Sequence, residues 1–125
     1  MVRADRPWGY YLVLHEESGY KVKQFVVKPG SRLSLQRHRH RAEHWHVVRG
    51  EATVTRGKEI VRLAPGGSID IPLGALHRVE SVGEENLVVI EVQVGEYVGE
   101  DDIERFEDDY GRVAPASGAD LPKMK

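Results

Sequence analysis

The chain has 125 residues, a formal net charge of −2 and no cysteine. That length is typical of a single domain that buries its own core without disulfide bonds. A pI near 6.3 gives no electrostatic basis for nucleic-acid binding, and no apolar run is long enough for a signal peptide or a membrane span. A chain without cysteine fits the reducing cytoplasm, which is the expected location.

Short segments with alternating or β-branched residues follow one another along the chain, separated by turn sequences such as "KPG", "APGG" and "VGEEN". This alternation predicts strands. The predicted strands cover residues 10–16, 20–28, 44–50, 51–56, 59–64, 68–72, 76–81 and 86–95. Many short strands with no long helical pattern favour an all-β sandwich or barrel.

The segment "GEDDIERFEDDYG" is the one helix candidate. Asp101 or Asp102 would cap it, and Ile103 and Phe106 would share one face. A short C-terminal helix is therefore expected at the end of a single domain spanning residues 1–112. Residues 113–125 offer little to bury and are expected to form a flexible tail.

Four of the six histidines fall within "LSLQRHRHRAEHWHVVRG", residues 33–50. Residues i and i+2 of a strand point to the same face. Gln36 and His38 should therefore project together, and Glu43 should point inward if the next strand turns that side to the core. With His77 these side chains make a mixed nitrogen and oxygen ligand set, which suits a divalent metal with open positions.

The other histidines are weaker candidates. His44 and His46 should face away from Glu43, although a register shift of one residue would bring His44 inward. His40 and His44 are therefore kept as reserve ligands. The alternative is that "HRHRAEHWH" is a solvated basic loop, which is the better interpretation of His40 and His46. His15 is expected on a strand surface.

The spacing of these residues resembles the two signature motifs of the cupin superfamily. The intervals run from Gly30 through Gln36-x-His38 and Glu43 to Gly50, and then from Gly66 through "PLG" to His77. Gln36 stands where cupins usually have a histidine, and Ser81 stands where they usually have asparagine. The resemblance implies a cupin-type double-stranded β-helix, a jelly-roll barrel. It also implies a metal site at Gln36, His38, Glu43 and His77.

The phrases "RPWGYY", "HRAEHW" and "GEDDIERFEDDYGR" narrow the resemblance to the cupin domain of type II mannose-6-phosphate isomerases, over residues 6–112. This implies an enzyme, a metal-dependent aldose–ketose isomerase that interconverts mannose 6-phosphate and fructose 6-phosphate. Type I enzymes also pair Gln-x-His with a glutamate and a distant histidine at zinc, which places zinc ahead of manganese, cobalt, nickel or iron. That family domain usually follows a nucleotidyltransferase domain, but nucleotidyl transfer is not expected of these residues.

Three side chains are candidates for the chemistry. Glu91 would be the general base if the polar face of its strand, which also carries Gln93, lines the cavity. Lys23 would move a proton or bind phosphate, and Arg41 would hold phosphate or stabilise an enediolate. In the alternative interpretation, Glu91 and Lys23 lie on solvent-facing strand surfaces and Arg41 is a loop arginine paired with an acid.

Two other functions compete with the isomerase. One is a different cupin enzyme, such as a dioxygenase with iron at the same four positions. The other is a non-catalytic module that binds a sugar phosphate. A small-molecule sugar phosphate is the expected partner, with no nucleic acid and no membrane, and cupin analogy favours a homodimer that uses "RPWGYY" at its edge.

Overall fold

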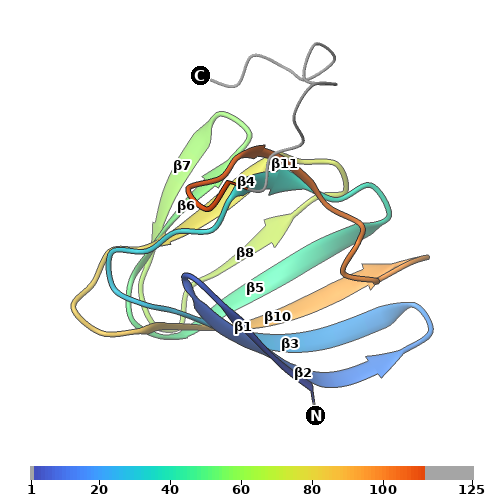
Figure 1. Cartoon of the computed structure of the whole chain (residues 1–125), viewed down its shortest axis with the longest axis horizontal. Helices are drawn as coiled ribbons and strands as arrows, with labels where there is room; N and C mark the ends of the chain where they lie inside the picture. The colour runs from blue at the N-terminus through green and yellow to red at the C-terminus, as the bar shows by residue number, and fades with distance from the viewer. Residues whose placement is uncertain (1, 112–125) are drawn as a thin grey trace.

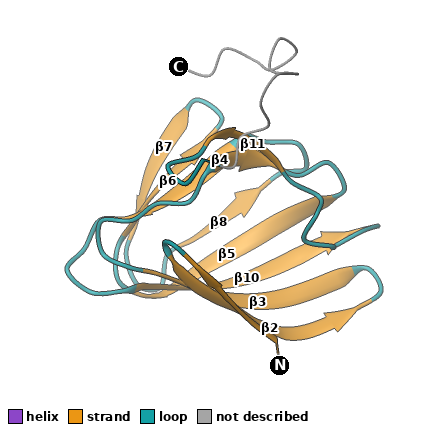
Figure 2. Cartoon of the chain, in the orientation of Figure 1, coloured by secondary structure: helices purple, strands orange, loops and turns teal. Residues whose placement is uncertain are grey.

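The computed structural model describes residues 2–111, and the predicted tail at 113–125 lies outside them. All regular elements in this range are strands (Figure 2). Among these residues no helix is long and apolar enough to cross a membrane. The strands are β1 Val2–Arg6, β2 Gly9–Glu17, β3 Tyr20–Val27, β4 Leu35–Arg37, β5 Arg41–Arg49, β6 Ala52–Arg56, β7 Glu59–Leu63, β8 Ser68–Ile71, β9 His77–Ser81, β10 Leu87–Gly95 and β11 Glu104–Glu107.

The strands form two antiparallel sheets that face each other (Figure 1). The six-stranded sheet has the order β1-β2-β3-β10-β5-β8, and the five-stranded sheet has the order β11-β4-β9-β6-β7. Partners that are distant in sequence lie side by side, because β10 pairs with both β3 and β5. The all-β sandwich or barrel predicted from the turn spacing is confirmed.

The predicted helix at residues 99–111 is wrong, and β11 stands in its place. Each acid of this strand has a cation on another strand of the same sheet: the Glu104 carboxylate accepts from Arg37 on β4 and the Glu107 carboxylate from Arg78 on β9, at 3.0 and 3.1 Å. The backbone also pairs with β4, with a bulge at Phe106. These long-range contacts outweigh a local helix signal that rested on two acids and two apolar residues.

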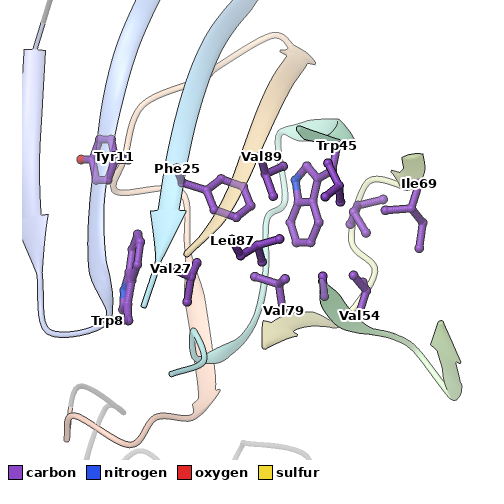
Figure 3. Packing of buried hydrophobic residues seen from close by; sticks show 13 residues of the cluster. Trp8, Tyr11, Phe25, Val27, Trp45, Val54, Ile69, Val79, Leu87 and Val89 are labelled. Atoms are coloured by element: carbon purple, nitrogen blue, oxygen red, sulfur yellow. The ribbon is translucent and has the colours of Figure 1, made fainter. Parts of the chain in front are cut away.

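The apolar core lies between the two sheets (Figure 3). Phe25 and Trp45 meet edge to face in it, with ring centroids 5.4 Å apart. Aromatic pairs in this arrangement add to the stability that burial provides. The buried members are Trp8, Tyr11, Phe25, Val27, Trp45, Val47, Ala52, Val54, Ile69, Ile71, Val79, Leu87 and Val89.

Gly50 makes the tight passage from β5 to β6 possible. Its φ of 82° belongs to the left-handed region, and a Cβ there would lie 2.6 Å from the Asn86 carbonyl oxygen. No side chain fits this position without moving the backbone that leads into β10. The glycine therefore allows the turn after β5 to pass close to the start of β10.

Candidate metal centre

The inner face of the six-stranded sheet changes from apolar to polar along three neighbouring strands, β3, β5 and β10. The ladders keep the polar ends together, because Gln93 pairs with Lys21 on one side and with Glu43 on the other. The buried polar members are Lys21, Lys23, Arg41, Glu43, Glu91 and Gln93. The barrel is therefore charged inside at one end and apolar at the other.

The facing sheet supplies Gln36, His38 and His77. Gln36 lies opposite His77 where β4 pairs with β9. His38 directly follows β4, two residues after Gln36, so both side chains turn inward. All three are buried, as the sequence predicted for inward-facing residues.

His38, Glu43 and His77 come together as a group that could hold a metal ion. One ligand atom from each lies within 4.8 Å of the others. The His38 Nε2 atom is 3.1 Å from Glu43 Oε2, and the His77 Nε2 atom is 3.9 Å from Glu43 Oε1. Two imidazoles and a carboxylate with no thiolate form a donor set that fits a divalent transition metal.

Backbone carbonyls fix both imidazole rings. The Nδ1–H of His38 donates to the Asp102 carbonyl oxygen at 2.7 Å, and the Nδ1–H of His77 donates to the Ala75 carbonyl oxygen at 2.9 Å. Each Nε2 lone pair is therefore directed at the centre, in the arrangement that metal-binding histidines commonly show. His38 Nε2 also accepts a hydrogen bond from Arg41 Nη2 at 3.3 Å.

Both rings are neutral at physiological pH. Burial, together with the Arg41 charge, lowers the pKa of His38 to about 3. Burial lowers the pKa of His77 to about 4. An imidazole must be neutral to bind a metal, so these shifts keep both nitrogens available as ligands.

Gln36 is the fourth residue of the predicted ligand set. Its side chain is 8% exposed and lines the same cavity. The amide Nε2 donates a long hydrogen bond to the Ser34 carbonyl oxygen at 3.4 Å. That bond leaves the amide oxygen as the ligand atom in the proposed set of four.

The three predicted catalytic side chains all line the cavity. Arg41 Nε donates to Glu43 Oε2 at 2.8 Å. Trp45 Nε1 lies 2.9 Å from Glu43 Oε1 and 3.1 Å from Glu91 Oε2. Burial and the nearby Glu43 carboxylate raise the pKa of Glu91 to about 8, so its protonated form predominates at neutral pH.

The remaining histidines lie outside the centre. His44 and His46 are exposed on the other face of β5, as parity predicted. The His44 ring pairs with Asp70 at 2.6 Å, the His40 ring with Glu96 at 2.9 Å, and the exposed His15 with Glu17 at 2.7 Å. None of them joins the group formed by His38, Glu43 and His77.

Residues 96–103, called the crossing segment here, connect β10 of one sheet to β11 of the other (Figure 1). Two of its acids, Glu100 and Asp102, were not predicted as part of the site, although both contact groups around it. The Glu100 carboxylate accepts from the ammonium groups of Lys21 and Lys23 at 2.8 and 3.0 Å. The Asp102 carboxylate accepts from the backbone N–H groups of Arg39 and His40, both at 3.0 Å.

The stability of the protein should depend on pH through Glu104, which lies just after the crossing segment. Hydrogen bonds from Arg39 and then Arg37 lower its pKa to about 2, from an ordinary value of 4.5. A carboxyl with a lowered folded-state pKa stabilises the protein above its unfolded pKa and loses that effect as pH falls through the folded pKa. The melting temperature of Glu104→Gln should therefore lie below that of the wild type at pH 6, and the gap should close between pH 4.5 and 2.

Thermal unfolding monitored by circular dichroism across that pH range measures this gap. Glu84→Gln, a change at an exposed residue before β10, is the control and should show no such gap. A gap for Glu104→Gln that stays constant down to pH 2 would contradict the role of the Arg37 and Arg39 contacts.

A jelly-roll of two antiparallel sheets with a buried His–Glu–His group between them defines a cupin with a candidate metal site. Residues 2–108 match the family model described as mannose-6-phosphate isomerase C-terminal. The chain belongs to this family, which confirms the resemblance seen in its motifs.

Curated relatives with more than 50% identity contain the same domain. The chain is 55% identical over 108 residues to the xanthan biosynthesis protein XanB of Xanthomonas campestris, covering 86% of this chain and 23% of XanB. It is 53% identical over 108 residues to the mannose-1-phosphate guanylyltransferase ManC of Salmonella typhimurium, covering 86% and 22%. It is 51% identical over 110 residues to the alginate biosynthesis protein AlgA of Pseudomonas fluorescens, covering 88% and 23%. The chain thus spans less than a quarter of the length of these relatives.

Solved structures show the same fold. The cupin domain of Schizosaccharomyces pombe Cnp3 has a TM-score of 0.67 at 15% identity, covering 69% of this chain and 64% of that one. A double-stranded β-helix protein of Klebsiella pneumoniae has a TM-score of 0.68 at 23% identity, covering 77% and 82%.

The predicted isomerase activity is wrong as an assignment for this chain. The relatives at 50–55% identity are named for mannose-1-phosphate guanylyltransferase and for xanthan or alginate biosynthesis, not for the isomerisation. What they share with this chain is the cupin domain alone. The word isomerase in the family description is therefore not evidence that this chain catalyses the isomerisation.

Proposed function

We propose that this chain is a metal-binding cupin domain that serves GDP-mannose synthesis and binds mannose 1-phosphate in its cavity. The supporting observation is that the buried His38–Glu43–His77 group shares one cavity with the cations of Lys23 and Arg41. A metal ion holds sugar oxygens, and fixed cations hold phosphate. Relatives named mannose-1-phosphate guanylyltransferase contain this domain, which supports the choice of ligand.

The proposed ligands of the ion are Gln36, His38, Glu43 and His77, with zinc ahead of manganese, cobalt, nickel or iron. A bound ion would act as a Lewis acid that polarises and orients the oxygens of the ligand. The protein's own contribution is to direct the imidazole nitrogens inward and to exclude water through burial.

Glu91, Lys23 and Arg41 are proposed to contact the bound sugar phosphate. Protonated Glu91 donates to a sugar hydroxyl, because its raised pKa of about 8 keeps it neutral at pH 7. Arg41 contacts Glu43 at 2.8 Å and the Gly99 carbonyl at 3.2 Å, so it bridges the metal group and the crossing segment. Lys23 on β3 and Trp45 on β5 lie on opposite sides of Glu91, and the Lys23 Nζ atom is 4.0 Å from Glu91 Oε1.

Titration calorimetry with mannose 1-phosphate tests the proposal. The chain is first loaded with zinc and its metal content is measured. We expect binding at one ligand per chain, weakened at least tenfold when the metal is removed with a chelator, and no comparable binding of mannose. Absence of stoichiometric metal after reconstitution, or equal heats with and without metal, would reject the function.

A homodimer in the cytoplasm is part of the same proposal. β1 is the outer strand of the six-stranded sheet and pairs with β2 in the described part of the chain. An outer strand carries backbone groups that can pair with a second copy. Light scattering on the purified chain gives the oligomeric state, and a monomer at all concentrations would contradict the proposed homodimer.

A further inference from the structure

Two lysines are buried beside the candidate metal centre. Lys21 and Lys23 project inward from β3 with exposed fractions of 3% and 7%. Buried ammonium groups are costly unless they are paired and hydrogen-bonded. Glu100 supplies the close pairing, since one of its oxygens lies 2.8 Å from Lys21 Nζ and the other lies 3.0 Å from Lys23 Nζ.

One carboxylate does not balance two ammonium groups. The next acids lie further away: Glu16 is 4.0 Å from Lys21 Nζ and half exposed, and Glu91 is 4.0 Å from Lys23 Nζ. Neither acid comes within hydrogen-bonding distance of an ammonium group, whereas Glu100 accepts from both. The lysine pair therefore keeps an excess positive charge, which a dianion would balance and a single carboxylate does not.

Gln93 is a second sign of a missing partner at this end of the barrel. Its side chain is fully buried and lies opposite Lys21 in the ladder. Within residues 2–111, neither its amide nitrogen nor its amide oxygen has a hydrogen-bond partner. Leaving both atoms unpaired is costly, so this end of the barrel interior is suited to a polar occupant.

We propose that Lys21 and Lys23 form an anion subsite for the phosphoryl group of the ligand, and that Glu100 is an internal carboxylate which the phosphoryl group displaces. This deepens the proposed function and rests on it for the identity of the sugar. Lysines bind phosphate as compact point charges, and a phosphoryl dianion matches their combined charge.

The position of the subsite relative to the metal group suits a small phosphorylated sugar. Lys21 and Glu43 flank Gln93 on strands that are two places apart in the sheet. Two strand spacings amount to about 10 Å. A sugar held by the metal group at one end can therefore place its phosphate at the lysine pair.

The position of Glu100 allows a phosphoryl group to displace its carboxylate from the two lysines. It belongs to the crossing segment, outside the strands, and its side chain is 40% exposed while both of its lysine partners are buried. The adjacent Gly99 carbonyl accepts a hydrogen bond of 3.2 Å from Arg41, which anchors the segment next to the metal group. Turning the Glu100 side chain outward would release both ammonium groups from their present partner without separating any strand, and Lys23 already lines the cavity.

The test measures the binding of inorganic phosphate by calorimetry, with chelator present so that no metal contributes. Glu100→Gln should bind phosphate about tenfold more tightly than the wild type, because the competing negative charge is gone. Glu84→Gln, which removes the same charge at an exposed residue before β10, is the control and should bind as the wild type does. A double variant with Lys21→Met and Lys23→Met should lose binding. Equal or weaker binding by Glu100→Gln, or retained binding by the double variant, would overturn the proposal.

Hydrogen exchange on the wild type gives a second measurement that does not depend on any variant folding. Added phosphate should increase exchange in residues 96–103, and unchanged or slower exchange would overturn the displacement of Glu100. Mannose 1-phosphate should reproduce the effect and mannose should not. Because these experiments run without metal, failure of the subsite is distinguishable from failure of the metal centre.

Discussion

Replacing His77 with alanine should abolish stoichiometric metal binding while the two sheets stay folded. His77 supplies one of the three ligand atoms that lie within 4.8 Å of one another, and its ring is fixed by the Ala75 carbonyl. Changes to the partners of metal ligands alone cost roughly 10- to 100-fold in affinity. Loss of a ligand should therefore weaken binding by at least about 100-fold.

Metal content after dialysis, measured by mass spectrometry, gives the direct result. The melting temperature gives a second one, because an ion that binds only the folded state stabilises it. Added zinc should raise the melting temperature of the wild type and leave that of His77→Ala unchanged. His46→Ala, on the exposed face of β5, should behave as the wild type. Full metal occupancy in His77→Ala would show that the centre lies elsewhere.

Replacing Asp102 with alanine should weaken metal binding although Asp102 is not a proposed ligand. Its carboxylate accepts from the backbone N–H groups of Arg39 and His40, both at 3.0 Å, and its carbonyl accepts from His38 at 2.7 Å. Without the carboxylate, the turn that carries His38 loses its attachment to the crossing segment. Hydrogen bonds to a charged group are worth about 1.5–3 kcal/mol, and metal affinity should fall by about 10- to 100-fold.

Zinc titration at a temperature well below the melting transition separates the two effects. Asp101→Ala is the matched control, since the neighbouring aspartate is exposed and contacts Tyr97. It should retain the affinity of the wild type. If Asp102→Ala lost stability but bound zinc as tightly as the wild type, Asp102 would support the fold alone and would not position His38.

Most of the strands could be predicted because their alternation and their turns are local signals. The strand at residues 59–64 is observed as Glu59–Leu63, and the one at 20–28 as Tyr20–Val27. The strands β1 and β11 were not predicted, and they are short and carry many charges. The partner of β11 lies far away in the sequence, since Arg105 pairs with Gln36 on β4. A window along the sequence does not contain such pairs.

The direction of the polar faces could not be read from alternation alone. On β10 the apolar residues Ile90, Val92 and Val94 alternate with Glu91 and Gln93, and ordinary burial would turn the apolar set inward. The structure turns Glu91 and Gln93 inward and leaves Val94 56% exposed. The pairing of Gln93 with Glu43 on β5 places both on the same inner face, and the sequence alone left the inward and outward interpretations open.

The contacts made by the crossing segment were the main feature of the site that the sequence did not predict. Its acids were interpreted as the start of a helix, yet Glu100 and Asp102 serve partners more than sixty residues earlier in the sequence. Burial of Lys21 and Lys23 would have required a nearby acid, but the sequence offers many acids and no rule for choosing among them. It is the connection of β10 to β11 across the barrel that places Glu100, and no other acid of the segment, beside the two lysines.

Because β3, β5 and β10 each have an apolar half and a polar half, the side chains that hold the barrel together are separate from those that would meet a ligand. An exchange at Lys21 or Gln93 alters the polar half of the interior without removing Phe25 or Leu87 from the apolar half. A scaffold divided in this way can change what it recognises through a few substitutions in its polar half. Solved structures that share this architecture at only 15–23% identity fit that freedom to diverge.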